Sequence, residues 1–188
     1  MPLTPRKMNN HSKKVANYLL KAGAFKVSLD PLFTWTSGIK SPVYCDLRAL
    51  ISDVEARDEI VTAFVEMIPA DVDVIAGTAT AGISWAAWIA DKMKKPMIYI
   101  RGEVKEHGTK KRIEGMLAAG QKVALIEDHI STGKSSISAI MALREEGSAI
   151  VDCVFAINTY EMAAAKKVYE EAGVKVSTIT NYSVILGE

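Results

Sequence analysis

The sequence predicts a single α/β domain whose core is a parallel β-sheet covered by helices on both faces. Its 188 residues are 49% hydrophobic, which is enough apolar content for one complete core. From residue 71 onward, short apolar runs alternate with helical patterns, an order typical of strand–helix–strand units. These apolar runs are nearly continuous, as expected for strands that are buried on both faces.

The first ~50 residues are expected to be an attachment to this core rather than an independent domain. Residues 11–22 predict a helix with Val15, Leu19 and Leu20 on its buried face. Residues 25–48 mix proline and glycine with aromatic side chains, a composition that predicts short strands and turns.

The core is expected to begin with a helix that ends near residue 68. Ser52 and Glu55 fit a capping box at its start. The remaining predicted elements are strands at 72–78, 96–101, 123–128, 149–158 and 174–179, and helices at 81–95, 134–146 and 160–172. Residues 102–120 show no periodicity and are rich in glycine and charge.

Composition excludes several classes of protein. The formal net charge of +1 gives no electrostatic footprint for nucleic acid or for a membrane surface. The two cysteines, Cys45 and Cys153, lie far apart in apolar surroundings, so we expect a reducing compartment and no disulfide framework. No signal peptide and no membrane-spanning run is recognisable. We therefore expect a soluble cytoplasmic protein.

Four candidate ligand-binding segments follow predicted strands, at 77–80, 101–102, 127–136 and 158–160. Ligands of open parallel sheets bind beyond the carboxyl ends of the strands, so these segments are expected to converge.

The third of these segments carries the strongest signal. Glu127 and Asp128 end a buried strand, and the turn 131–135 leads into a helix. Backbone N–H groups at a helix N-terminus favour a phosphate, although Ser and Thr here also fit an ordinary helix cap. Two adjacent carboxylates repel each other unless a partner meets them. Vicinal ribose hydroxyls, or a magnesium ion carried by the ligand, are suitable partners.

The aperiodic segment 101–115 is unusually cationic between its glycines. It is either a solvated loop or a lid that closes on a polyanion, and long loops in compact domains are usually functional or disordered. His107 can in addition donate a proton to a departing oxyanion. The cationic residues are Arg101, Lys105, His107, Lys110, Lys111 and Arg112.

Two weaker patterns remain open at this stage. The small residues of 77–83 suit either the close approach of a ligand or close helix–strand packing. Phe33, Trp35 and Tyr44, with the turn 37–42, can wall a planar ring or form local core. No spacing typical of metal ligands occurs.

The segment VALIEDHISTGKSS resembles the phosphoribosyl-pyrophosphate (PRPP) binding motif of the type I phosphoribosyltransferases. From about Leu19 to the C-terminus, the chain is similar to the orotate branch of this family. The segments that carry this narrower resemblance are FTWTSGIKSPVYCDLR, VIAGTATAGI, YIRGEVKEHG with the trailing IEG, and GQKVALIEDHISTGKSS.

The resemblance implies a Rossmann-like core with a mainly parallel five-stranded sheet, and a small hood over it. The hood is expected at roughly residues 1–50 and the core at 51–188, within one domain. The implied reaction joins orotate to PRPP and releases diphosphate and orotidine 5′-monophosphate in pyrimidine synthesis. It also implies magnesium carried by PRPP near Asp128, and a homodimer in which loop 101–115 reaches the neighbouring site.

The same resemblance implies roles for individual residues. Lys105 and His107 are the expected catalytic residues of the lid. The expected orotate contacts are Ser131, Lys40 and Tyr44. The expected PRPP contacts are Arg101, Lys105, His107, Glu127, Asp128, His129, Ile130, Ser131, Thr132, Gly133, Lys134 and Ser135.

The chain departs from the family pattern in the lid and in the motif. Gly102 and Glu103 follow the lid arginine, where many members have a basic residue first, and His129 and Lys134 replace an aliphatic and a small residue. We expect Lys134 either to add positive charge beside the 5′-phosphate or to point to solvent. Two other functions remain open: transfer to another base, and a non-catalytic regulator that senses PRPP.

Overall fold

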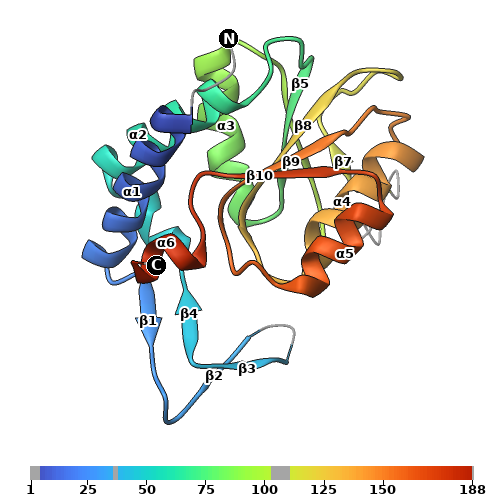
Figure 1. The fold of residues 1–188 in the computed structure, drawn as a ribbon. Coiled ribbons are helices and arrows are strands. Elements are labelled where there is room, and N and C mark those ends of the chain that lie inside the picture. The colour runs from blue at the N-terminus through green and yellow to red at the C-terminus, as the bar shows by residue number, and fades with distance from the viewer. Residues whose placement is uncertain (1–4, 36–37, 103–110, 188) are drawn as a thin grey trace.

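The computed structural model describes residues 5–35, 38–102 and 111–187. Its centre is a six-stranded sheet in the order β10-β9-β8-β5-β6-β7 (Figure 1). Five strands run parallel, which confirms the predicted sheet. They are β5 (Val74–Thr78), β6 (Met97–Ile100), β8 (Val123–Ile130), β9 (Cys153–Thr159) and β10 (Lys175–Thr178). The sixth, β7 (Ile113–Glu114), lies in the segment predicted to lack periodicity and pairs antiparallel with β6.

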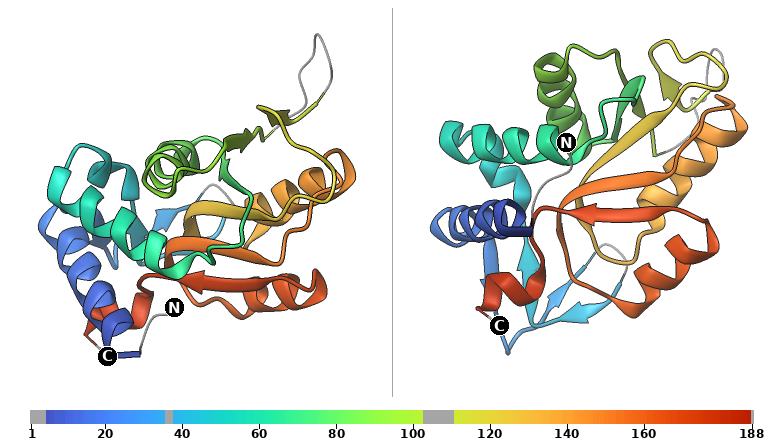
Figure 2. Two further views of the ribbon diagram at one scale, coloured as in Figure 1. Left: turned by 90° about the horizontal axis from the view of Figure 1, so that it is seen from above. Right: turned by 45° about the horizontal axis from the view of Figure 1, so that its top comes forward.

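Helices cover both faces of the sheet, as predicted (Figure 2). On one face, Ile75 and Ile126 pack in a cluster with residues of α2 (Val54–Met67) and α3 (Ala81–Met93). On the other face, Val74 and Leu125 pack with α4 (Lys134–Glu145) and α5 (Ala163–Glu171). Successive residues of one strand thus serve opposite faces, which is why the strand sequences are apolar throughout.

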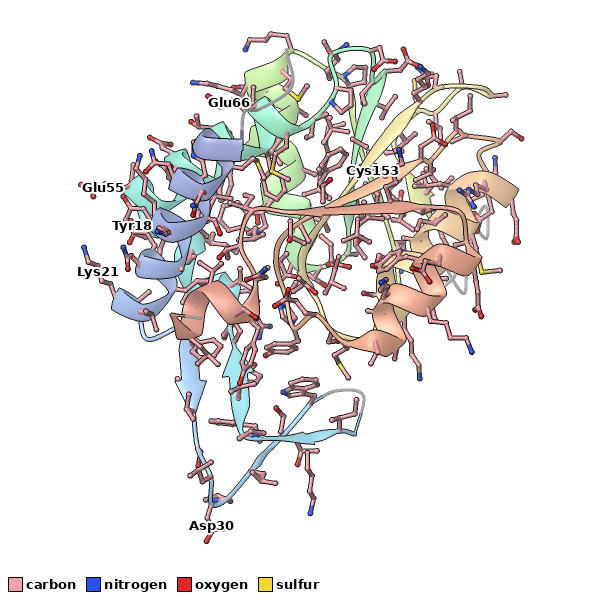
Figure 3. The ribbon with its side chains drawn as sticks, viewed as in Figure 1. Tyr18, Lys21, Asp30, Glu55, Glu66 and Cys153 are labelled. Atoms are coloured by element: carbon pink, nitrogen blue, oxygen red, sulfur yellow. The ribbon has the colours of Figure 1, made fainter. Side chains whose placement is uncertain are left out.

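The N-terminal hood combines an α-helix and a short 3-10 helix with two small antiparallel pairs of strands. These elements are α1 (Pro5–Lys21), β1 (Phe25–Val27) paired with β4 (Val43–Cys45), β2 (Phe33–Thr34) paired with β3 (Lys40–Ser41), and a 3-10 helix, η1 (Leu47–Ile51). The β1–β4 pair extends away from the core, and Asp30 marks the far tip of the hood (Figure 3). A C-terminal helix, α6 (Tyr182–Leu186), packs near α1 and brings Tyr182 to within 6.1 Å of Phe25, ring centre to ring centre.

Several predicted details were wrong. Helix α1 begins at Pro5 rather than residue 11, and Leu20 lies 49% exposed beside the buried Val15 and Leu19. The capping box at Ser52 does not form, because the carboxylate of Asp53 accepts the Ala56 N–H at 3.0 Å and caps α2 instead.

Two strand boundaries also differ from the predicted ones, as the pairing of β8 with β9 shows. Strand β8 extends to Ile130 because His129 and Ile130 lie opposite Asn158 and Thr159 of β9. The regular part of β9 begins at Cys153, four residues later than predicted.

Among the described residues, no helix has the length and apolarity needed to cross a bilayer.

Candidate functional site

The four predicted ligand-binding segments lie at the same end of the sheet, where the parallel strands have their carboxyl ends. Strands β6, β5, β8 and β9 are adjacent and parallel, so their carboxyl ends at Ile100, Thr78, Ile130 and Thr159 lie together at that end. A cavity of about 300 Å³ opens there between hood and core. Its lining comes from the hood (Trp35, Tyr44, Cys45, Asp46 and Arg48) and from the core (Ala81, Glu127, Asp128, His129, Ser131, Ser135 and Tyr160).

The acid pair lies at the floor of this cavity and is held by local hydrogen bonds. Glu127 is only 5% exposed, and Ser135 donates its hydroxyl to Glu127 Oε2 at 3.0 Å. The Asp128 N–H donates to Glu127 Oε1 at 3.3 Å, and the His129 N–H donates to Asp128 Oδ1 at 2.8 Å. The turn and the acid pair therefore form one connected unit.

The two carboxyl groups of this pair are not equivalent. Burial, followed by the negative charge of Asp128, raises the pKa of Glu127 well above its ordinary value. Burial also raises the pKa of Asp128, but hydrogen bonds from Glu127 and the His129 backbone oppose this effect, as does the positive charge of Arg48. Glu127 therefore holds a proton more readily than Asp128, and the Asp128 carboxylate is the stronger acceptor for the hydroxyls of a diol.

The turn after β8 presents the N-terminus of α4 to the cavity. Gly133 precedes the helix with φ +80°, a conformation that favours glycine. Ser131 and Ser135 line the cavity, while Lys134 is exposed. The side chain of Ile130 is 2% exposed and packs in the core, and its predicted contact with PRPP remains a prediction.

The two glycines of segment 77–83 serve close helix–strand packing. A Cβ on Gly82 would lie 2.5 Å from the Ile126 carbonyl oxygen, and one on Gly77 would lie 2.7 Å from the Gly82 oxygen. The start of α3 thus rests directly on β5 and β8. Ala81, at the first position of α3, also lines the cavity. Small residues therefore bring α3 close to the acid pair.

Aromatic rings join the hood to the core across the cavity. Trp35 stacks on Tyr160 with 4.3 Å between ring centres and 6° between planes. Tyr160 in turn meets the His129 ring at 4.1 Å in an edge-to-face arrangement, and Trp35 donates Nε1–H to the Val43 carbonyl at 2.9 Å. Tyr44 is half-buried and lines the cavity. The aromatic residues of the hood thus form a wall of this site.

Lys40, the other predicted orotate contact in the hood, is placed differently. It lies on β3 with its side chain exposed, and it is not among the described residues that line the cavity. Its contact with orotate remains a prediction.

His129 is neutral in this setting. Burial lowers the pKa of His129 to about 4, and the Asn158 side-chain amide lies 3.4 Å from its Nδ1. The same amide approaches Cys45 Sγ at 3.9 Å. Burial raises the pKa of the Cys45 thiol to about 12, so it stays protonated and is a poor nucleophile at neutral pH. His129 thus adds no positive charge to the site.

The cationic residues of segment 101–115 have different roles. Arg101 follows β6 and forms an ion pair with Glu114 at 3.7 Å. Arg112 is structural, because it donates to the Arg101 carbonyl at 2.9 Å and to the Ser138 carbonyl at 3.0 Å. Lys111 is exposed. Lys105, His107 and Lys110 lie outside the described residues, so their predicted roles are untested.

Comparison with known proteins agrees with this geometry. Residues 55–185 match the family described as "Phosphoribosyl transferase domain". An orotate phosphoribosyltransferase from Fusobacterium nucleatum is 48% identical over 185 residues, which cover 95% of this chain and 87% of that protein. A second, from Streptococcus sanguinis, is 48% identical over 178 residues, covering 93% and 85%. The chain belongs to the orotate phosphoribosyltransferase family.

Solved structures agree with this assignment of family. The crystal structure of orotate phosphoribosyltransferase from Aeropyrum pernix is 30% identical with a TM-score of 0.81, over 92% of this chain and 96% of that one. The Mycobacterium tuberculosis orotate phosphoribosyltransferase in complex with PRPP shares the fold, with a TM-score of 0.70 and 21% identity, over 93% and 98% of the two chains.

Arg48 is one residue of this family member's site that the sequence did not single out. Its guanidinium forms an ion pair with Asp46 at 2.8 Å, and both residues line the cavity. The sequence does show the charged pair Asp46 and Arg48 at the end of the aromatic hood segment. However, no local sequence pattern indicates that this segment lies beside Asp128. Tyr160 lay in a predicted segment, yet its partner Trp35 is 125 positions away.

Proposed function

We propose that this protein transfers the 5-phosphoribosyl group of PRPP to orotate, giving diphosphate and orotidine 5′-monophosphate in pyrimidine synthesis. The observation that carries the proposal is that the acid pair Glu127–Asp128, the turn before helix α4 and the aromatic residues of the hood all surround one cavity. The names of relatives nearly half identical to this chain support orotate as the acceptor.

The turn 131–135 binds the 5′-phosphate. Free backbone N–H groups at the start of α4, together with the helix dipole, favour an anion there. The hydroxyl of Ser131 lines the same cavity and adds a donor, whereas the proton of Ser135 is given to Glu127. The charge of Lys134 lies on the first turn of α4, exposed, and raises the local positive potential.

The acid pair binds the 2′- and 3′-hydroxyls of the ribose. Asp128 accepts hydroxyl protons, and Glu127 supplies a further acceptor oxygen. Because Ser135 already bonds to Glu127, the phosphate turn and the sugar site are held at a fixed separation. Fixed placement of this kind aligns C1 of the ribose with the incoming base.

The hood supplies the site for the base. Tyr44, Trp35 and Tyr160 provide flat apolar surface at the cavity wall, and Ser131 offers a hydrogen bond. In the reaction, the ring nitrogen of orotate forms a bond to C1 as the bond from C1 to the diphosphate oxygen breaks. No protein nucleophile is required, since the demand is for alignment and charge neutralisation.

The lid segment neutralises the departing diphosphate. Arg101 directly follows β6 at the carboxyl end of the parallel strands, where it pairs with Glu114. Lys105 supplies further positive charge, and His107 gives a proton to the leaving oxyanion. In this proposal two copies associate as a homodimer in the cytoplasm, and loop 101–115 of each copy reaches the neighbouring site.

Magnesium enters with PRPP rather than through a dedicated protein site. The described residues contain no group of three or more His, Cys, Asp or Glu side chains suited to a metal. The Asp128 carboxylate lines the cavity and would offer the ion an oxygen ligand. When bound, magnesium shares in neutralising the diphosphate.

Loss of orotate absorbance on adding PRPP and magnesium tests this function directly. We expect turnover with orotate and none with adenine, guanine, hypoxanthine or uracil. Turnover with one of those bases and not with orotate would show that this base, rather than orotate, is the acceptor. PRPP binding without turnover on any base, at any pH from about 6 to about 9, would show a PRPP-sensing regulator instead.

A further inference from the structure

A buried pair of hydroxyls lies beneath the phosphate turn, outside the cavity. Tyr169 of α5 is 3% exposed and Ser136 of α4 is 1% exposed. The Tyr169 hydroxyl is hydrogen-bonded to Ser136 Oγ. Ser136 Oγ also bonds to the Gly133 carbonyl at 3.3 Å. A line of contacts therefore runs from α5 through α4 to the turn.

The proton positions in this line follow from counting donors. The Gly133 carbonyl can only accept, so the single proton of Ser136 goes to it. Ser136 Oγ must then accept the proton of Tyr169. Burial raises the pKa of Tyr169 to about 12, so its hydroxyl keeps that proton at neutral pH.

The Gly133 carbonyl sets the direction of a backbone N–H in the turn. It accepts from Ser136 Oγ and from the Ile137 N–H, the latter at 2.9 Å. The peptide group is planar and trans, so the N–H of Lys134 points opposite to this carbonyl. Holding the carbonyl toward the helix thus aims the Lys134 N–H away from it, toward the mouth of the turn.

Tyr169 also supports the turn by direct contact. A Cβ on Gly133 would lie 3.1 Å from a ring carbon of Tyr169 and 3.1 Å from Val168 Cγ2. The backbone of the turn therefore rests on α5, and the position of the Tyr169 ring decides where the turn lies.

We propose that Tyr169 is a positioning residue for the phosphate turn, acting through Ser136 and the Gly133 carbonyl on the N–H groups that bind the 5′-phosphate. The inference rests on the proposed function, since it assigns that phosphate to the turn. Tyr169 does not touch the substrate.

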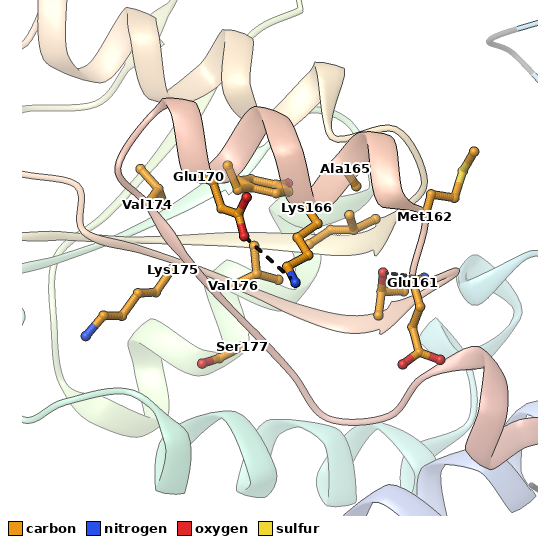
Figure 4. Close-up of a pocket in the computed structure, with 12 residues that line it drawn as sticks. Glu161, Met162, Ala165, Lys166, Glu170, Val174, Lys175, Val176 and Ser177 are labelled. Atoms are coloured by element: carbon orange, nitrogen blue, oxygen red, sulfur yellow. Dashed lines mark hydrogen bonds and ion pairs between the residues drawn. The ribbon is translucent and has the colours of Figure 1, made fainter.

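A second cavity lies beside Tyr169. A space of about 690 Å³ separates α5 from β10, and Tyr169 is among its lining residues. The lining mixes small side chains such as Ala165 with long charged ones such as Lys166 and Glu170 (Figure 4). Tyr169 is itself only 3% exposed and packs in the core, so packing and the bond to Ser136 both hold its ring. Removing the hydroxyl alone therefore tests the bond while the packing of the ring is kept.

Tyr169→Phe tests the proposal because it keeps the ring and removes only the hydroxyl. We expect the KM for PRPP to rise about two- to tenfold, the range for loss of one hydrogen bond. The KM for orotate should stay within about twofold. Tyr18→Phe, on α1 at the opposite side of the molecule (Figure 3), is the matched control and should leave both constants unchanged.

Ser136→Ala removes the same contact from the other side, together with the bond to the Gly133 carbonyl. If the line of contacts acts as a unit, Tyr169→Phe combined with Ser136→Ala should raise the KM for PRPP no more than the larger single change. Fully additive effects would contradict the coupling. A lower melting temperature with an unchanged KM for PRPP in both single variants would show a merely structural role and overturn the proposal.

Binding of ribose 5-phosphate, measured by titration calorimetry, separates this inference from the proposed function. It should weaken in Tyr169→Phe by the same factor as the KM for PRPP. Wild-type protein that binds ribose 5-phosphate but makes no orotidine 5′-monophosphate would refute the function and leave the positioning role to be decided by the variant's affinity. Equal affinity of wild type and variant would refute the positioning role alone.

Discussion

Gly82→Ala gives a sharp test of how α3 meets the sheet. Helix propensity alone predicts that alanine stabilises this position by about 1 kcal/mol. The structure predicts the opposite sign, because the new Cβ would lie 2.5 Å from the Ile126 carbonyl oxygen. Relief requires α3 or β8 to shift, and overpacking of this kind costs about 1–3 kcal/mol.

This cost should be visible in both stability and activity. For a chain of this size, the melting temperature should fall by roughly 2–12 °C, measured by scanning fluorimetry and checked by urea unfolding. Ile126 directly precedes Glu127, so a shift of β8 also moves the acid pair, and the KM for PRPP should rise. Gly102→Ala is the stability control, because a Cβ added there would meet nothing within 4 Å. A Gly82→Ala protein as stable as wild type would refute the packing.

Three further predictions concern the site itself. The pKa of Glu127 in the folded protein is raised above its ordinary 4.5, so its contribution to stability is complete below pH 4.5 and is lost as pH rises through the folded-state pKa. Glu127→Gln should therefore gain in melting temperature relative to wild type from about pH 5 to about pH 8. A difference in melting temperature that stays constant with pH would contradict the raised pKa. Tyr160→Leu removes the stack with Trp35 and should raise the KM for orotate about two- to tenfold, with the KM for PRPP less changed; equal rises would point to general damage. Lys105→Ala should lower turnover by about a hundredfold while orotate affinity is nearly kept, and unchanged turnover would remove Lys105 from catalysis.

The parts of the site that sequence predicted are those that lie close together in the chain. Glu127, Asp128 and the turn 131–135 span nine positions, and their hydrogen bonds follow from one strand running into one helix. The parallel sheet was equally predictable, because apolar strands alternating with helices can bury their surfaces in few other ways.

The sequence was less informative where two residues, or two structural explanations, fitted the same local pattern equally well. Ser52 and Asp53 are both good helix caps, and only the path of η1 into α2 decided that Asp53 accepts the Ala56 N–H. The small residues of 77–83 fitted a ligand turn or close packing. The approach of Gly82 to Ile126 shows the close packing, while Ala81 lines the cavity and a ligand contact there stays a prediction.

By itself, the sequence determined the α/β class, the acid pair and the helix-capped turn, since each depends on periodicity or on neighbours in the chain. Only the tertiary structure placed Arg48 near Asp128, stacked Trp35 on Tyr160 and set Tyr169 beneath the turn. These contacts join residues that are tens of positions or more apart. Their partners are chosen by how hood, sheet and helices pack, and no local pattern encodes that choice.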